Sequence, residues 1–123
     1  MVLRIAKTFD FDAAHHLPMT PDDHKCHRMH GHTYRVEIGL RGRVHANGMI
    51  LDYADIASAW QPIHDALDHR VLNDIPGLEN PTTEVLVEWI VERLSLGFLS
   101  HNHTALWSVR VYESSTTWVE WVP

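Results

Sequence analysis

The chain has 123 residues and a formal charge of −6, and 45% of its residues are hydrophobic. A chain of this length accommodates one domain around one core, so we expect a single domain over residues 1–123. An acidic chain lacks the basic surface that general nucleic-acid binding requires. No apolar run approaches the ~18 residues of a membrane span, and the first residues do not build the apolar block of a secretory signal. We therefore expect a cytoplasmic protein that binds neither nucleic acid nor membranes.

Two stretches near the N-terminus alternate between apolar and polar residues, which predicts half-buried β-strands. The first covers residues 3–15, where Lys7 is the one charged residue on the apolar face. The second covers residues 30–41. Residues 17–29 between them show no period and are rich in Pro, Asp, His and Met, so we expect a loop that carries function.

Two helices are predicted after the second strand. Residues 53–67 carry apolar side chains at helical spacing, with Asp52 as the N-cap and with Pro62 expected to kink or restart the helix. A second helix is expected to begin near residues 80–84, with a proline in its first turn, and to end near Gly97.

Residues 106–113 and 117–122 are predicted as two further strands. The resulting order (strand, strand, helix, helix, strand, strand) predicts an α+β fold with a four-stranded antiparallel sheet and two helices. Four strands leave the sheet edges open, and joining these edges between copies of the chain would remove that liability.

Three histidines share the apolar face of the two N-terminal strands. His15 ends the first strand, while His30 and His32 begin the second. Residues two apart on a strand point to the same side, so antiparallel pairing would bring the three imidazoles together. Three neutral imidazoles suit zinc and leave a fourth position for water or substrate, as in catalytic sites. The alternative is that each is a core histidine with a buried partner of its own.

Further candidate residues lie near these strand and helix ends. Cys26 is the single cysteine, so no intramolecular disulfide can form; its thiol is either inert and buried, a base or nucleophile beside a metal, or a fourth zinc ligand. Glu113 shares the parity of Trp107 on the buried face of a predicted strand, where a carboxylate suits the amidine-like edge of a ligand. Asp68 and His69 place an acid and an imidazole together at a helix end, which suits a proton shuttle.

We expect no metal role for most of the remaining histidines. His16 and His27 adjoin the predicted site and would allow a second or misplaced metal. His101 and His103 have metal-like spacing but fall in a predicted loop.

These motifs together resemble the 6-pyruvoyl-tetrahydropterin synthase superfamily, and within it the bacterial 6-carboxy-5,6,7,8-tetrahydropterin synthases of queuosine and deazapurine biosynthesis. The resemblance spans nearly the whole chain, and residues 116–123 match least well. It depends on the order and spacing of FDAAH at 11–15, CHRMHGH at 26–32, LDH at 67–69, LNDIP at 72–76 and NPTTE at 80–84.

The resemblance implies a role for each candidate residue. It makes His15, His30 and His32 zinc ligands, Cys26 the catalytic base, Asp68 and His69 its proton-transfer partners, and Glu113 the pterin anchor. It also implies a tunnelling fold whose barrel closes by trimerisation, with trimers stacked into homohexamers. Active sites then lie between subunits, where Asp68 and His69 would serve a neighbouring chain's zinc.

The reaction implied by the resemblance converts 7,8-dihydroneopterin triphosphate to 6-carboxytetrahydropterin, acetaldehyde and triphosphate. Lys25, Arg28 or Arg70 would supply cations for the triphosphate, and the sequence does not choose among them. One alternative is a 6-pyruvoyl-tetrahydropterin synthase, which shares the zinc and the thiol. Another is a non-catalytic zinc-binding module, which predicts a closed metal site that includes Cys26.

Overall fold

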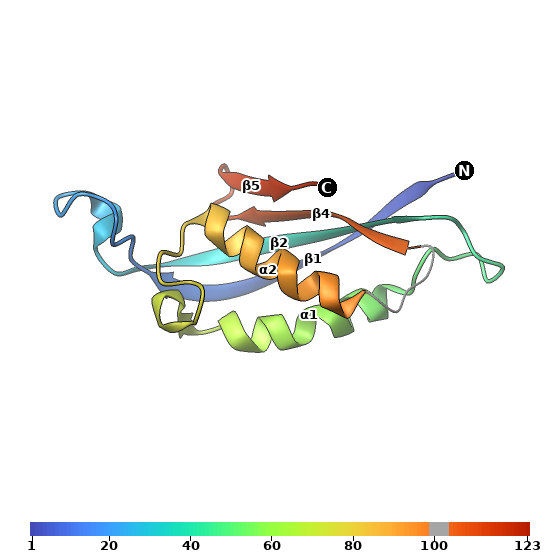
Figure 1. The fold of residues 1–123 in the computed structure, drawn as a ribbon, viewed down its shortest axis with the longest axis horizontal. Helices are drawn as coiled ribbons and strands as arrows, with labels where there is room; N and C mark the ends of the chain where they lie inside the picture. The colour runs from blue at the N-terminus through green and yellow to red at the C-terminus, as the bar shows by residue number, and fades with distance from the viewer. Residues whose placement is uncertain (99–103) are drawn as a thin grey trace.

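The computed structural model describes residues 1–98 and 104–123, so His101 and His103 lie outside the described residues. Two helices cover one face of a single sheet (Figure 1). The elements in chain order are β1 (Leu3–His15), β2 (His30–Gly42), α1 (Tyr53–Leu67), β3 (Arg70–Val71), α2 (Thr83–Gly97), β4 (Thr104–Tyr112) and β5 (Trp118–Trp121). Short 3-10 turns cover Lys25–His27 and Leu72–Asp74. The predicted α+β class and the order of the main elements are confirmed.

The sheet of the described residues has five strands in the order β3-β1-β2-β4-β5, and the predicted count of four was wrong. The additional strand, β3, has two residues and runs parallel to β1 beside Ala13 and Ala14. A strand this short shows no alternation in the sequence, so periodicity could not reveal it. It nevertheless fixes the residues just before it against the end of β1.

β1 and β2 pair antiparallel without a register shift, from Leu3 opposite Gly42 to His15 opposite His30. Alternate side chains of both strands point toward the helices and are buried, among them Phe11, Tyr34 and Ile38. The last residues of β1 and the first residues of β2 therefore lie at the same end of the sheet, where alternate side chains point to the helix-covered face.

The pairing of β2 with β4 contains a bulge between Gly39 and Leu40. The extra residue on β4 is Trp107, since Gly39 lies opposite Ser108 and Leu40 opposite Leu106. The bulge overturns the expectation that Trp107 shares the face of Glu113. The indole of Trp107 lies beside the guanidinium of Arg41, on the face without helices.

α1 begins after Asp52, whose carboxylate accepts the Ala54 N–H at 2.9 Å. The helix runs unbroken through Pro62, so the expected restart was wrong. Buried apolar side chains on both sides of Pro62 stabilise the helix against the sheet and offset the proline's cost of about 3 kcal/mol. They are Ile56, Trp60, Ile63 and Leu67.

α2 begins at Thr83, with the hydroxyl of Thr82 accepting the Val85 N–H at 3.2 Å. Pro81 therefore precedes the cap, and the prediction that it lies in the first turn was wrong. Among the described residues, no helix combines the length and the apolar character needed to cross a bilayer.

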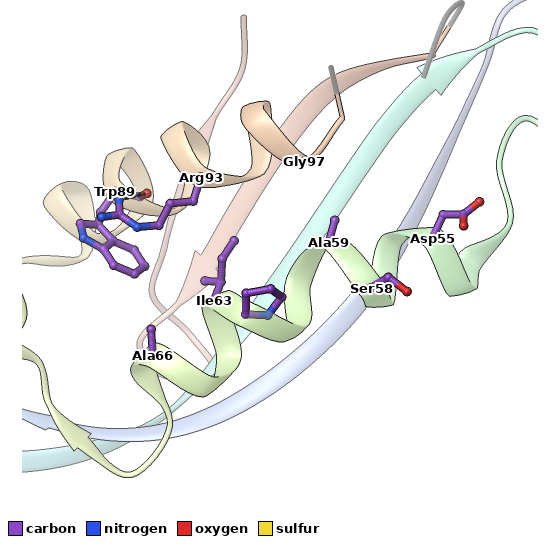
Figure 2. A pocket seen from close by; sticks show the side chains of 9 residues that line it. Asp55, Ser58, Ala59, Ile63, Ala66, Trp89, Arg93 and Gly97 are labelled. Carbon is purple, nitrogen blue, oxygen red and sulfur yellow. Dashed lines mark hydrogen bonds between the residues drawn. The ribbon is translucent and has the colours of Figure 1, made fainter. Parts of the chain in front are cut away.

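The outer side of the helix pair holds a cavity of about 560 Å³. Figure 2 shows Ala59, Ile63 and Ala66 on α1 and Trp89 and Arg93 on α2 around it. None of the predicted site residues lines this cavity.

Ile38 has no exposed surface, and its truncation measures the packing between sheet and helices. Ile38→Ala should lower the free energy of unfolding by about 2–5 kcal/mol, because it removes buried methyl groups and leaves a cavity. Urea denaturation at one fixed protein concentration measures the change. The control is Arg35→Ala on the same strand, where the side chain is 60% exposed and the cost should stay below about 1 kcal/mol. Equal losses for the two variants would contradict the assigned faces of β2.

Candidate functional site

The end of the β1–β2 pair gathers three histidines on the helix-covered face. His15 is 1% exposed and lies directly opposite His30, while His32 lies opposite Ala13. The ring centroids are 4.6 Å apart for His15 and His30, 5.0 Å for His15 and His32, and 4.8 Å for His30 and His32. One ring nitrogen of each histidine lies within 4.8 Å of the others. The predicted convergence of the three imidazoles is thus present.

Hydrogen bonds to the backbone orient two of these rings. The Nδ1–H of His15 donates to the carbonyl of Pro81 at 2.9 Å, and the Nδ1–H of His30 donates to the carbonyl of Arg28 at 2.7 Å. A neutral imidazole with its proton on Nδ1 presents an unprotonated Nε2. These two Nε2 atoms face each other at 3.1 Å.

The third ring adds an unpartnered nitrogen to the same place. Nε2 of His32 is buried and has no hydrogen-bond partner among the described residues. Burial lowers the pKa of His15 and of His32, because it penalises the charged imidazolium. The rings of His15 and His32 therefore tend to stay neutral, which is the state in which imidazole binds a metal.

These features fit a divalent cation better than a protein-only network. Two facing lone pairs at 3.1 Å repel each other unless a proton or a cation lies between them. In the described part of the chain, only His15, His30 and His32 form such a group, and Cys26 does not belong to it. Three protein ligands leave room for an exogenous ligand, as in catalytic zinc sites. The donor set thus fits zinc in an open site, and the described residues do not form the closed site with sulfur that the non-catalytic alternative predicts.

A carboxylate adjoins this group. Oε1 of Glu113 lies 3.6 Å from Nε2 of His32, and Oε2 accepts the hydroxyl of Thr83 at 2.8 Å. Thr83 is buried at the start of α2, so the helix holds one oxygen of the carboxylate in place. A cavity of about 290 Å³ lies next to it, lined by Glu113, Thr83 and Trp118 among others. A polar planar ligand could therefore reach the carboxylate close to the histidines.

Asp68 and His69 form a pair at the C-terminal end of α1, beside β1. His69 Nδ1–H donates to Asp68 Oδ2 at 2.9 Å, while the N–H of Asp12 donates to Asp68 Oδ1 at 3.0 Å. Those bonds, the one from Asp12 foremost, lower the pKa of Asp68, and the carboxylate raises the pKa of His69.

The backbone of His69 has φ of 57°, in the left-handed region that non-glycine residues seldom adopt. Its N–H donates to the carbonyl of Asp12 at 2.6 Å, which holds this conformation. A sparsely populated backbone conformation costs of order 1 kcal/mol or more, and such residues cluster at functional sites.

One residue of the pair and one of the three histidines line the same cavity. His32 and His69 both line a cavity of about 480 Å³ beside Asp12 and Arg70. No hydrogen bond or ion pair within residues 1–98 and 104–123 joins Asp68 or His69 to the three histidines.

Cys26 lies in the 3-10 turn Lys25–His27, partly exposed. Its N–H donates to Nδ1 of His24 at 3.0 Å, and its carbonyl accepts the N–H of Leu17 at 2.8 Å. These bonds fix the backbone of the loop next to β2, four residues before His30.

Sequence reasoning missed three parts of this site. The carbonyl of Pro81 orients His15, the hydroxyl of Thr83 orients Glu113, and the backbone of Asp12 holds the Asp68–His69 pair. Backbone groups carry no signal in the sequence, and a threonine at a helix start reads as a capping residue. His16 and His27 do not join the three histidines within the described residues.

The fold and the site define a class of protein, namely a small α+β domain with three histidines that could hold a metal at one end of an antiparallel strand pair. The family model for 6-pyruvoyl tetrahydropterin synthase matches residues 4–123, and the chain belongs to this family.

Individual relatives agree with this assignment. A 6-carboxy-5,6,7,8-tetrahydropterin synthase from Synechocystis sp. is 35% identical over 119 residues, which cover 92% of this chain and 88% of the relative. A dihydroneopterin monophosphate aldolase from Pyrococcus furiosus is 34% identical over 94 residues, or 76% of each chain. The structure of Caenorhabditis elegans 6-pyruvoyl tetrahydropterin synthase has a TM-score of 0.88 at 24% identity and covers 100% of this chain and 96% of that one. The predicted family and tunnelling fold are confirmed.

Zinc binding tests the histidine group. Metal-free protein should take up one Zn²⁺ per chain, and binding should raise the melting temperature, because a ligand at 100 times its Kd stabilises the native state by about 2.7 kcal/mol. His30→Ala and His32→Ala should each lose most of this shift. His45→Ala is the control and should keep it, because His45 lies in the loop between β2 and α1 and does not belong to the histidine group. Unchanged zinc affinity in His30→Ala would contradict the assignment.

The Asp68–His69 pair predicts a pH dependence. Because the pKa of His69 is raised above its usual 6.5, the pair stabilises the native state below pH 6.5, and this stabilisation is lost as pH rises through the native pKa. Asp68→Asn should lower the titration midpoint of His69, as followed by NMR of its ring protons. Asp65→Asn, one turn earlier on α1, should leave it unchanged. A midpoint that stays or rises in Asp68→Asn would show that the carboxylate does not hold the imidazolium.

Proposed function

We propose that this chain is a zinc-dependent 6-carboxy-5,6,7,8-tetrahydropterin synthase of queuosine and deazapurine biosynthesis. It would convert 7,8-dihydroneopterin triphosphate and one water to 6-carboxytetrahydropterin, acetaldehyde and triphosphate. The observation that carries the proposal is the 3.1 Å approach of Nε2 of His15 to Nε2 of His30, with the buried Nε2 of His32, which has no hydrogen-bond partner among the described residues, in the same group. The 35% identity to the Synechocystis sp. enzyme supports the choice of reaction.

His15, His30 and His32 would hold the zinc ion, and their Nδ1–H bonds to backbone carbonyls keep two of the rings aimed at it. When bound, zinc supplies Lewis-acid polarisation of the hydroxyl oxygens on the substrate's side chain, which acidifies the neighbouring C–H and O–H bonds.

Glu113 would anchor the pterin ring. The amidine-like edge of a pterin presents N–H donors side by side, and a carboxylate accepts such a pair with its two oxygens. Thr83 fixes one of these oxygens, and the cavity beside Glu113 gives the ring a place at this carboxylate, whose Oε1 lies 3.6 Å from Nε2 of His32. The anchor would thus set which substrate carbon faces the metal.

Cys26, Asp68 and His69 would move protons. The thiolate of Cys26 would take a proton from the substrate's side chain and transfer it between side chain and ring, as a general base near a cation can. His69, with its raised pKa, carries a proton that Asp68 stabilises and can return it to the substrate. Elimination of triphosphate would follow, and water would complete the carbon–carbon cleavage that releases acetaldehyde.

Assembly would complete the site. Asp68 and His69 form no hydrogen bond or ion pair with the three histidines within the described chain, which supports a role at a neighbouring chain's zinc. The outer edge of β5 and most of the outer edge of β1 have no partner strand in the described residues. Closing these edges in a homohexamer of stacked trimers would remove them. We also propose that the enzyme works in the cytoplasm.

The sister reaction that yields 6-pyruvoyl-tetrahydropterin is the main alternative, because the family model bears that name. A non-catalytic zinc module is less well supported, since the histidine group does not include the sulfur of Cys26.

Incubation of the zinc-loaded protein with dihydroneopterin triphosphate separates these functions. The proposal predicts 6-carboxytetrahydropterin by mass spectrometry and acetaldehyde in equal amounts. A pyruvoyl product without acetaldehyde would assign the sister reaction. An unchanged substrate would leave only a zinc-binding role and refute the proposal.

Cys26→Ala tests the proposed base. Turnover should fall about 10²–10⁴-fold, which is the usual contribution of a positioned acid or base, while zinc content and melting temperature stay near those of the wild type. Met19→Ala in the same loop is the control, because its side chain is 81% exposed, and should keep full turnover. Full turnover in Cys26→Ala would remove the thiol from the mechanism.

A further inference from the structure

A basic and aromatic cluster lies on the helix-free face of the sheet, at the end opposite the three histidines. Arg4 on β1 and Arg41 on β2 are directly paired in the strand register. Their guanidinium carbons lie 5.0 Å and 4.4 Å from the ring centroid of Trp107. Trp107 is the extra residue of the β4 bulge, so the bulge is what brings the indole to the two arginines.

The charges of this cluster have no counter-charge in the described chain. No carboxylate of residues 1–98 or 104–123 forms an ion pair with Arg4, Arg41 or the nearby Arg43. The arginines farther along the same face are paired, Arg35 with Asp10 at 3.7 Å and Arg110 with Glu120 at 3.4 Å.

Like charges directly opposite on neighbouring strands destabilise a sheet, and the indole offsets only part of this through cation–π attraction. The chain as a whole carries a net charge of −6, so this unpaired cluster is a positively charged region on an acidic protein. A bound anion would remove the repulsion.

The cluster borders a cavity of about 340 Å³, lined by Arg41, Arg43 and Trp107 together with Val2, Gly42 and Ala105. Arginine binds phosphate oxygens in a bidentate manner, and three positive charges match a chain of phosphoryl groups better than a single carboxylate.

We propose that this cavity binds a polyphosphate group, held by Arg41 and Arg43, which line it, while Arg4 beside the indole of Trp107 adds a third positive charge. The group can belong to inorganic triphosphate or to a nucleoside triphosphate. This site lies apart from the histidines and does not depend on the function proposed above.

Isothermal titration of the zinc-loaded protein with inorganic tripolyphosphate at about 150 mM salt tests the proposal, since weak long-range attraction is screened there. Arg41→Gln should weaken binding about tenfold or more, because charge-assisted contacts are lost. Arg35→Gln on the same strand and face is the matched control and should bind as the wild type does. Any binding of phosphate at the histidines or to zinc is common to both variants, so the difference between them reports the new site alone.

The same titration with ATP separates the two sources of the group. Equal affinity for tripolyphosphate and ATP would show that the phosphate chain alone is recognised. Tighter binding of ATP that is lost in Trp107→Phe would assign a nucleotide that uses the indole. Either result supports the site only if Arg41→Gln weakens the binding. Binding that Arg41→Gln and Arg35→Gln weaken equally, or no saturable binding in the wild type, would overturn the proposal.

Discussion

The site depends on the register between β1 and β2. His15 stands directly opposite His30, and His32 follows two residues later on the same face, so three imidazoles share one point only in this alignment. A slip by one residue would turn one strand's histidines to the other face. The buried residues of the same strands, such as Phe11 and Tyr34, oppose that slip because it would expose them. The hydrophobic core and the three-histidine group are therefore specified by the same pairing.

Residues at the ends of the two helices orient side chains of the site that the strands carry. The residues before α2 supply the carbonyl that holds the Nδ1–H of His15, and the first residue of α2 supplies the hydroxyl that holds Glu113. The end of α1 supplies Asp68 and His69 through the backbone of β1. Both helix ends thus act on one end of the sheet, which is how a domain of 123 residues places Glu113, the Asp68–His69 pair and the three histidines at that end.

Much of this arrangement could be predicted from the sequence, because its determinants are long-range periodicities. Thirteen-residue strands reveal their faces by alternation, so the convergence of His15, His30 and His32 followed from parity and antiparallel pairing. The predictions that were wrong concern local features of the backbone. The bulge that turns Trp107 to the other face breaks parity at a single residue, and the two-residue strand β3 is too short to show any parity. The continuity of α1 through Pro62 depends on packing against the sheet, which local helix rules do not include.

The central claim is that the three histidines form a metal site with a coordination position left for substrate. X-ray absorption spectroscopy at the zinc edge of the loaded protein measures the ligand set directly. The account predicts three imidazole nitrogens at about 2.0–2.1 Å, one further oxygen, and no sulfur. A zinc–sulfur distance near 2.3 Å, or a shell with fewer than three imidazoles, would contradict it.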